Sequence, residues 1–201
     1  MSSAATPNIV TNFADLDPEG SYTYTDYLLW HFQERVELIK GRIFRMSPAP
    51  NMAHQRASQA LNFALLSFFR QRSCQVFVAP FDVRLPVPDK KGRDATVVQP
   101  DLCVLCDERK LDEQGCNGAP DWVIEILSPG NSRMEMREKF RVYEEAGVRE
   151  YWIVNPAEKV VIQFVLNAQG QFYGLAPAIE DDQLTPHIFP ELVVDLKEVF
   201  S

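Results

Sequence analysis

The spacing of apolar residues predicts two long helices, each with one face turned toward a sheet. Between about residues 52 and 72, apolar residues recur every three or four positions, as in a helix that lies on a sheet. The residues of this stripe are Ala53, Ala57, Ala60, Leu61, Ala64, Leu65 and Phe68. A second stripe, made by Met136, Phe140 and Tyr143, predicts a helix over about 133–146 that ends at Gly147.

Runs of strand-forming residues predict the sheet. Residues 35–48 have the pattern of a hairpin that turns at Lys40-Gly41, and a short helix capped by Thr25 is expected before it, within 22–32. Five further strands are expected within 74–85, 97–106, 121–128, 150–154 and 159–166. The order of hairpin, helix, three strands, helix and two strands predicts an α/β fold with a mixed central sheet flanked by helices.

Length and composition are those of one globular domain. The chain has 201 residues, of which 46% are hydrophobic and 24% charged, enough to bury a core. Residues 1–21 are polar and acidic, which predicts a flexible arm, and residues 22–201 form the predicted domain. No apolar run approaches the ~20 residues of a membrane span, and the N-terminus lacks the pattern of a secretory signal. We therefore expect a cytoplasmic protein.

The formal net charge of -8 at first argues against a nucleic-acid partner. Most of this negative charge lies in the first 30 residues and in residues 180–201, so the remaining chain is close to neutral. Its basic residues could contact phosphates or could form an ordinary solvated face. These basic residues include Arg35, Lys40, Arg42, Arg45, Arg56, Arg70 and Arg72.

The cysteines do not have the spacing of a zinc site. Cys103 and Cys106 form a C-x-x-C, but no second pair of ligands follows, and residues three apart on a strand point to opposite faces. We expect these two, together with Cys74 and Cys116, to be small buried apolar side chains in a reducing compartment.

Two acids interrupt apolar strands. Asp101 lies in VVQPDLCVLC (97–106) and Glu125 in DWVIEILSPG (121–130). An unpaired buried carboxylate costs several kcal/mol. If the two strands are neighbours, both acids could share one cation, and hard oxygen ligands select Mg²⁺ or Mn²⁺. In the alternative, one acid lies at an exposed strand end and the other pairs with an arginine.

Lys139 is the third candidate for a residue of the active site, after Asp101 and Glu125. It lies on the margin of the buried stripe of its helix, from which its ammonium could reach the two carboxylates. There it could orient water or stabilise the charge of a phosphoryl transition state. In the alternative, Lys139 forms an exposed pair with Glu135 one turn before it.

Several motifs together resemble the Uma-two family over about residues 22–201. They are VELIKGRI, SPAPNMAHQRAS, APFDVRL, QPDLCVL, WVIEILSPG, REKFRVYEEAGVREYWIVNP and IFPELVVDLKEVF, in the order of that family. The family consists of restriction endonucleases with the PD-(D/E)XK fold, so the resemblance implies a magnesium-dependent endonuclease acting on DNA. Double-strand cutting usually requires two active sites, so a homodimer is expected from this function.

The resemblance also implies roles for individual residues. Asp101 and Glu125 would hold the metal together with the backbone carbonyl of Ile126. The superfamily pattern places a lysine two residues after the second acid, where this chain has Leu127, and Lys139 matches the position that the Uma-two family uses instead. Glu135 is a further departure, since the family usually has aspartate there.

Glu37 and His54 also match family positions. Glu37 would complete the metal shell, or would be a strand-end acid paired with Arg42 or Arg45. His54, at the start of the first long helix, would belong to the site or be a structural histidine. Two other functions remain open: a catalytically silent module that binds nucleic acid or a protein partner, and a hydrolase of small phosphate esters.

Overall fold

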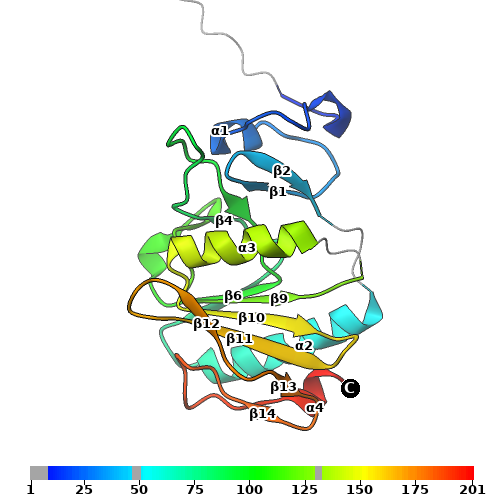
Figure 1. Cartoon of the computed structure of the whole chain (residues 1–201), viewed down its shortest axis with the longest axis vertical. Helices are drawn as coiled ribbons and strands as arrows, with labels where there is room; N and C mark the ends of the chain where they lie inside the picture. Colours follow the sequence, from blue (N-terminus) through cyan, green and yellow to red (C-terminus); the bar gives the residue numbers. More distant parts are fainter. Residues whose placement is uncertain (1–8, 47–50, 130–132) are drawn as a thin grey trace, which may run out of the picture.

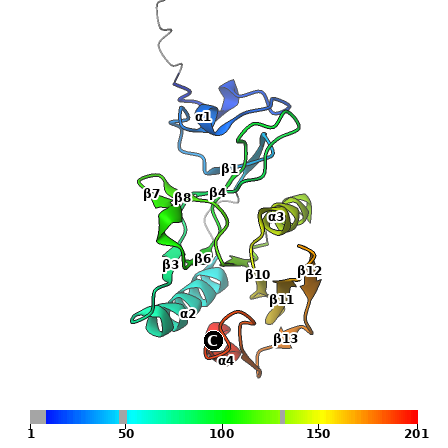
Figure 2. The same cartoon turned by 90° about the vertical axis from the view of Figure 1, so that its left-hand side faces the viewer.

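Helices and sheets alternate in layers along the long axis of the molecule (Figure 1). The computed structural model describes residues 9–46, 51–129 and 133–201. Helix α3 (Arg133–Ala146) lies between a smaller and a larger sheet, and the view turned by 90° shows the same order (Figure 2). Helices α2 (Met52–Phe69) and α4 (Leu196–Val199) cover the opposite face of the larger sheet.

The larger sheet has seven strands and is mixed. Its order is β12-β11-β10-β9-β6-β3, with β13 also paired to β11, and among the described strands of this sheet only β9 and β10 run parallel. One face packs on α2 and the other on α3, so the predicted mixed α/β architecture is confirmed. The strands are β3 (Gln75–Val78), β6 (Leu102–Leu105), β9 (Trp122–Ile126), β10 (Glu150–Asn155), β11 (Val160–Leu166), β12 (Phe172–Gly174) and β13 (Ala178–Ile179).

The smaller sheet has six strands in the order β2-β1-β5-β4-β8-β7. The predicted hairpin is its edge, and its turn is at Lys40 (φ 50°) and Gly41 (φ 81°), as in a two-residue hairpin turn. A Cβ at Gly41 would lie 2.9 Å from Ser21 Oγ, so space as well as conformation favours glycine. The strands are β1 (Val36–Ile39), β2 (Arg42–Arg45), β4 (Val83–Arg84), β5 (Val97–Val98), β7 (Leu111–Asp112) and β8 (Gly115–Asn117).

Two of the predicted strands divide between the sheets. The run 74–85 separates into β3 and β4, and the run 97–106 into β5 and β6, so each crosses from one sheet to the other. Each crossing contains a proline, Pro80 after a cis bond and Pro100 just before β6. A proline cannot donate to a ladder, which fits these breaks in pairing.

The helix boundaries differ in detail from those expected. Helix α1 (Tyr24–Tyr27) is capped by Thr23, which forms a capping box with Asp26, so Thr25 is inside the helix and is not the cap. Helix α2 ends at Phe69, and α3 covers the predicted range. The remaining elements are the 3₁₀ turns η1 (Phe13–Asp15) and η2 (Glu108–Lys110) and a separate pair of strands, β14 (Gln183–Leu184) and β15 (Val194–Asp195).

Two of the four cysteines are not the free thiols that we expected. Cys74 and Cys106 form a disulfide, whereas Cys103 and Cys116 are free and buried. The register of β3 and β6 explains this correction, since its extension from Gln75–Leu105 by one residue places Cys74 opposite Cys106.

The N-terminal segment contacts the domain where it is described. Val10 forms a bridge with Trp30, and Leu16 is buried. Residues 1–8 lie outside the described part, and the division at residue 21 stays a prediction. None of the described helices combines the length and the apolar character needed to span a bilayer.

Candidate active site where the two sheets meet

The two crossing segments contact each other and place Asp101 at the junction of the sheets. The N–H of Ala79, in the first crossing, donates to the carbonyl of Asp101 at 3.0 Å. The Gln99 side chain, in the second crossing, donates from Nε2 to Asp82 Oδ1 at 2.7 Å. The break in both strands therefore fixes the backbone that carries Asp101.

The Asp101 carboxylate is held by β9 and by the first turn of α2. Its Oδ2 accepts a hydrogen bond from the N–H of Ile126 at 2.8 Å, and its Oδ1 lies 3.2 Å from Nε2 of His54. Asn51 caps α2 by accepting from the N–H of His54, which sets the start of the helix. The Asp101 side chain remains 21% exposed, so it can still accept a ligand.

Pro100 affects the backbone of Ile126. The register of β6 and β9 ends at the pair Leu102–Ile124, and its continuation by two residues beyond β6 places Pro100 opposite Ile126. Because proline has no N–H, β6 offers no backbone donor to the Ile126 carbonyl. The Ile126 carbonyl, which we predict to be a metal ligand, therefore receives no hydrogen bond from the backbone of Pro100.

Glu125 is held from α3. Its Oε1 accepts from Lys139 Nζ at 3.0 Å and from the Tyr143 hydroxyl at 2.6 Å. Lys139 and Tyr143 are one helical turn apart, so both side chains face the sheet from the same side of α3. All three residues are buried, which makes the exposed Glu135–Lys139 pair wrong; Glu135 is itself buried, with Oε1 4.0 Å from Lys139 Nζ.

Glu37 joins this group from the smaller sheet. Its Oε1 accepts from the N–H of Gln99 at 2.8 Å and lies 2.9 Å from Lys139 Nζ. The pairing with Arg42 or Arg45 that we left open is therefore wrong. Its other oxygen, Oε2, is buried and has no hydrogen-bond partner among the described residues.

The pKa values of these groups show how strongly they interact. Burial, reinforced by Asp101 and Glu37, raises the pKa of Glu125 to about 8 although Lys139 opposes the shift. Burial likewise raises the pKa of Glu37. Burial alone would lower the pKa of Lys139, but Glu125 and Glu37 outweigh it and hold that pKa well above its ordinary value. The single positive charge of Lys139 is thus not sufficient to keep the pKa values of Glu125 and Glu37 at their ordinary level.

The donor set fits a hard divalent cation that is completed by water and substrate. The described residues contain no group of three or more His, Cys, Asp or Glu side chains that could by themselves hold a metal. Mg²⁺ is usually bound by one or two carboxylates together with water and phosphate oxygens. Asp101, Glu125 and the Ile126 carbonyl match that pattern.

The structure brings together all the residues that the sequence singled out. Asp101, Glu125, Ile126, Lys139, Glu37 and His54 are linked by the contacts above. Tyr143 was recognised only as part of an apolar stripe. Its position four residues after Lys139, with a hydroxyl on a face that is otherwise apolar, was the signal that it is also a polar partner.

Comparisons with known proteins agree with this geometry. No curated protein matches the chain. A crystal structure described as "a putative nuclease belonging to DUF820 from Anabaena variabilis ATCC 29413" is similar in fold, with a TM-score of 0.68 and 23% sequence identity; the match covers 89% of this chain and 97% of that one. The predicted restriction-endonuclease-like fold is thereby confirmed. The family model described as "Putative restriction endonuclease" matches residues 24–197, so the chain belongs to the Uma2 (Uma-two) family.

Proposed function

We propose that the chain is an endonuclease that hydrolyses DNA phosphodiester bonds with Mg²⁺ or Mn²⁺ as its cofactor. The family and the fold support a nuclease function. The observation that carries the finer proposal is the convergence of Asp101 and Glu125 with an ammonium, Lys139, that lies 3.0 Å from Glu125. Carboxylates for a metal and a cation for the phosphoryl group are the parts that phosphodiester hydrolysis requires.

Asp101, Glu125 and the carbonyl of Ile126 would hold the metal. When bound, the ion would polarise a phosphoryl oxygen and lower the pKa of a water molecule. The chain's contribution is to fix the two carboxylates. The backbone N–H of Ile126 and the imidazole Nε2 of His54 orient the Asp101 carboxylate. The Tyr143 hydroxyl orients the Glu125 carboxylate. Mutation of such partners of metal ligands commonly lowers metal affinity or activity by ~10–100-fold.

Lys139 would act on the substrate. Glu37 and Glu125 hold its ammonium 2.9 Å and 3.0 Å away and keep it protonated. From there it would donate to the attacking water or to the charge that develops on the phosphoryl oxygens. Leu127, the residue after β9, occupies the usual lysine position, and the ammonium comes from Lys139 on α3 instead.

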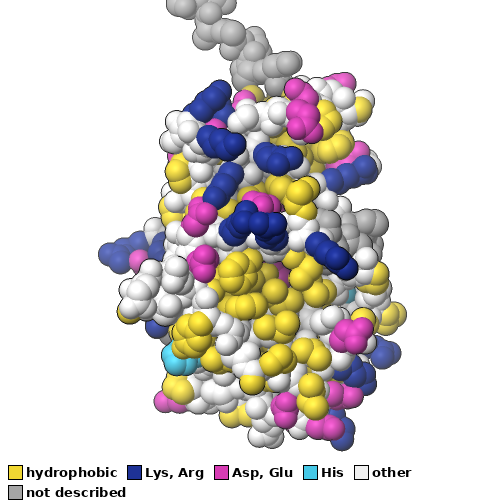
Figure 3. All heavy atoms as spheres, in the orientation of Figure 1, with side chains coloured by type: hydrophobic (Ala, Val, Ile, Leu, Met, Phe, Trp, Pro, Cys, Tyr) yellow, Lys and Arg dark blue, Asp and Glu magenta, His cyan; other side chains and the backbone are white. Residues whose placement is uncertain are grey.

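The charge on the surface is compatible with a nucleic-acid partner despite the net negative total. Lys and Arg side chains gather over the half of the molecule that carries the smaller sheet and α3 (Figure 3). A hollow of about 530 Å³ there is lined by Lys40, Arg42, Lys90 and Lys91, which outnumber by one the acids Glu19, Asp89 and Glu138 in the same lining. Such clusters attract phosphates by a sequence-independent, salt-dependent interaction.

A silent binding module is the second candidate. It is favoured by the pairing of Lys139 with two carboxylates, since that pairing can also stabilise a site that never binds metal. A homodimer stays a prediction that follows from double-strand cleavage.

Calorimetry with Mg²⁺ and Mn²⁺, followed by cleavage of plasmid and linear DNA, separates the two candidates. We expect metal binding and metal-dependent cleavage by the parent protein and neither by Asp101→Asn. Metal binding without cleavage of any DNA substrate would favour the silent module, and the absence of both would reject the metal site.

A further inference from the structure

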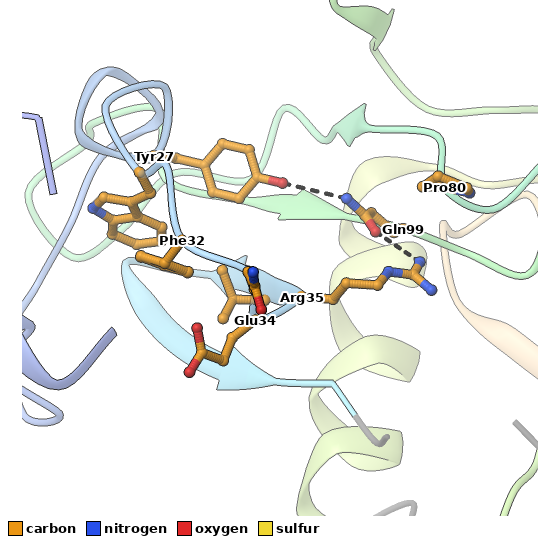
Figure 4. A pocket seen from close by; sticks show the side chains of 9 residues that line it. Tyr27, Phe32, Glu34, Arg35, Pro80 and Gln99 are labelled. Atoms are coloured by element: carbon orange, nitrogen blue, oxygen red, sulfur yellow. Dashed lines mark hydrogen bonds between the residues drawn. The ribbon is translucent and has the colours of Figure 1, made fainter. Parts of the chain in front are cut away.

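A cleft of about 480 Å³ opens beside the candidate active site. Three aromatic residues line it, together with Arg35, Pro80 and Gln99. Tyr27 and Phe32 lie at one end of the cleft, and Arg35, Gln99 and Pro80 lie at the other (Figure 4). A volume of this size is in the range of small-molecule sites and is sufficient for a nucleotide.

The cleft shares its wall with the carboxylate site. The N–H of Gln99 donates to Glu37, which contacts Lys139. Only Pro100 separates Gln99 from Asp101, so their Cα atoms are at most ~7.6 Å apart, two virtual bonds of the chain. A phosphate at Asp101 therefore places the base of an adjacent nucleotide near the cleft.

The aromatic residues offer ring surface to that base. Trp30 and Phe32 are stacked, with centroids 5.9 Å apart and planes 27° from parallel, and Tyr27 lies 5.5 Å from Trp30. All three are only half-buried, so part of each ring borders the open cleft. Bases stack on such rings with little dependence on sequence, because every base has a π-face.

The opposite end of the cleft is polar and fixed. Arg35 donates to Gln99 Oε1 at 2.8 Å, and Gln99 in turn donates to Asp82 and, at 3.4 Å, to the Tyr27 hydroxyl. Among the described residues no carboxylate forms an ion pair with Arg35. Its guanidinium keeps donors for a phosphate. Glu34, which also lines the cleft, is partly neutralised by Arg45 at 3.9 Å.

We propose that this cleft binds an unpaired base of the same nucleic-acid strand whose phosphodiester lies at Asp101 and Glu125, with Arg35 on the adjoining phosphate. The inference rests on the proposed function and names its substrate class: a single strand, or a nucleotide displaced from a duplex. A base within a duplex is stacked on both faces and cannot reach side chains without leaving the stack.

Tryptophan fluorescence tests the proposal without cleavage. The chain has three tryptophans, and Trp122 and Trp152 are fully buried, so quenching by a ligand reports on Trp30. In EDTA, we expect a short oligodeoxythymidine to quench this fluorescence. An abasic oligonucleotide of equal length should bind at least ~5-fold more weakly, the loss expected when one stacking contact is removed. Equal affinity and equal quenching for the two oligonucleotides would overturn the base pocket.

A variant pair adds a second test. Phe32→Leu should weaken binding of the thymidine oligonucleotide by ~5-fold or more and leave binding of the abasic one unchanged. Phe63→Leu is the matched control, since Phe63 is 73% exposed on α2 and lines no part of this cleft. Equal losses for both oligonucleotides, or no loss, would contradict stacking at Phe32. If Phe32→Leu does not fold, the abasic comparison in the parent protein decides the question.

The test of base binding in the cleft and the test of the proposed nuclease function can fail independently of each other. A protein that binds unpaired bases but cleaves no DNA would support the cleft and reject the nuclease. A protein that cleaves duplex DNA with Mg²⁺ but shows no base-dependent quenching would reject the cleft alone.

Discussion

The Tyr143 hydroxyl donates a 2.6 Å hydrogen bond to Oε1 of Glu125, the same oxygen that accepts from Lys139. This bond favours the ionised carboxylate and lowers the pKa of Glu125 against the larger effect of burial, which raises it. Tyr143 is therefore a positioning residue for Glu125, and its hydroxyl acts on both the orientation and the charge of that group.

Tyr143→Phe should weaken both metal binding and cleavage. Loss of a hydrogen bond to a charged group costs about 1.5–3 kcal/mol, so we expect a fall of ~10–100-fold in the cleavage rate. The pKa of Glu125 should rise, which moves the pH at which activity appears to a higher value. Rate–pH profiles in Mg²⁺ measure both effects. Tyr24→Phe is the control, because Tyr24 lies on α1 and interacts with Arg84, not with Glu125; equal profiles for both variants would reject the role of Tyr143.

Lys139→Met should cost both stability and activity. It leaves Glu37 and Glu125 buried without their ammonium, and the loss of one partner of a buried ion pair typically costs ~3–5 kcal/mol. The cost should be smaller at pH 5 than above pH 8, since Glu125, with a pKa of about 8, is protonated at the lower pH. Urea unfolding in EDTA at both pH values checks this.

Lys159→Met provides the comparison for that experiment. Lys159 is 48% exposed and pairs with Glu180, and exposed pairs contribute ~0–1 kcal/mol to stability.

Cleavage by Lys139→Met should fall by two orders of magnitude or more, as when one charge-stabilising donor is removed. Cleavage within about threefold of the parent would remove Lys139 from the mechanism.

The pH dependence of metal binding follows from Glu125. With a pKa of about 8 in the metal-free protein, Glu125 is protonated at pH 6 and must lose its proton before it can bind a cation. Affinity should therefore rise with pH, by about 50-fold between pH 6 and pH 8, with about one proton released per ion bound at pH 6 and about half a proton at pH 8. Calorimetry in buffers of different ionisation enthalpy measures both quantities. An affinity that is constant over this range would show that Glu125 is not a ligand.

The metal-free protein should also lose stability as pH rises. The pKa of an ordinary glutamate is 4.5, and Glu125 binds its proton more tightly than that when folded. Between pH 4.5 and about 8 the folded state thus holds more protons than the unfolded state, and stability falls with rising pH. Glu125→Gln should reduce this slope in EDTA.

The sequence was most informative where its signal is local. The long helices follow from apolar periodicity and the hairpin from Lys40-Gly41, and both are present. The second sheet could not be predicted in this way, because β4 and β5 have only two residues each and exist only where a longer run crosses between sheets. The disulfide depends on the register of β3 and β6, which no local pattern reports.

The site shows the same limit. The unusual setting of Asp101 and Glu125 in apolar runs was visible in the sequence. Periodicity alone placed Lys139 at the margin of α3, and its complete burial depends on the smaller sheet, which covers that side of the helix with Glu37. A residue that appears marginal on one helix can thus be central once a second sheet is present.

Pro100 gives the last prediction. The register of β6 and β9, continued by two residues beyond β6, places Pro100 opposite Ile126, and proline offers no N–H to the Ile126 carbonyl. Pro100→Ala supplies that N–H, so the ladder can extend by one hydrogen bond and occupy the carbonyl that would otherwise bind the metal. We expect Mg²⁺ affinity to fall by ~10-fold, a factor typical of a lost or competed ligand contact. The stability of the metal-free protein should change by less than ~1 kcal/mol, because the added hydrogen bond offsets the lost packing. Calorimetry and urea unfolding test the two parts. Pro86→Ala serves as control, since Pro86 is exposed and lies outside both crossings and outside the cleft. Undiminished Mg²⁺ affinity in Pro100→Ala would exclude the Ile126 carbonyl from the metal shell.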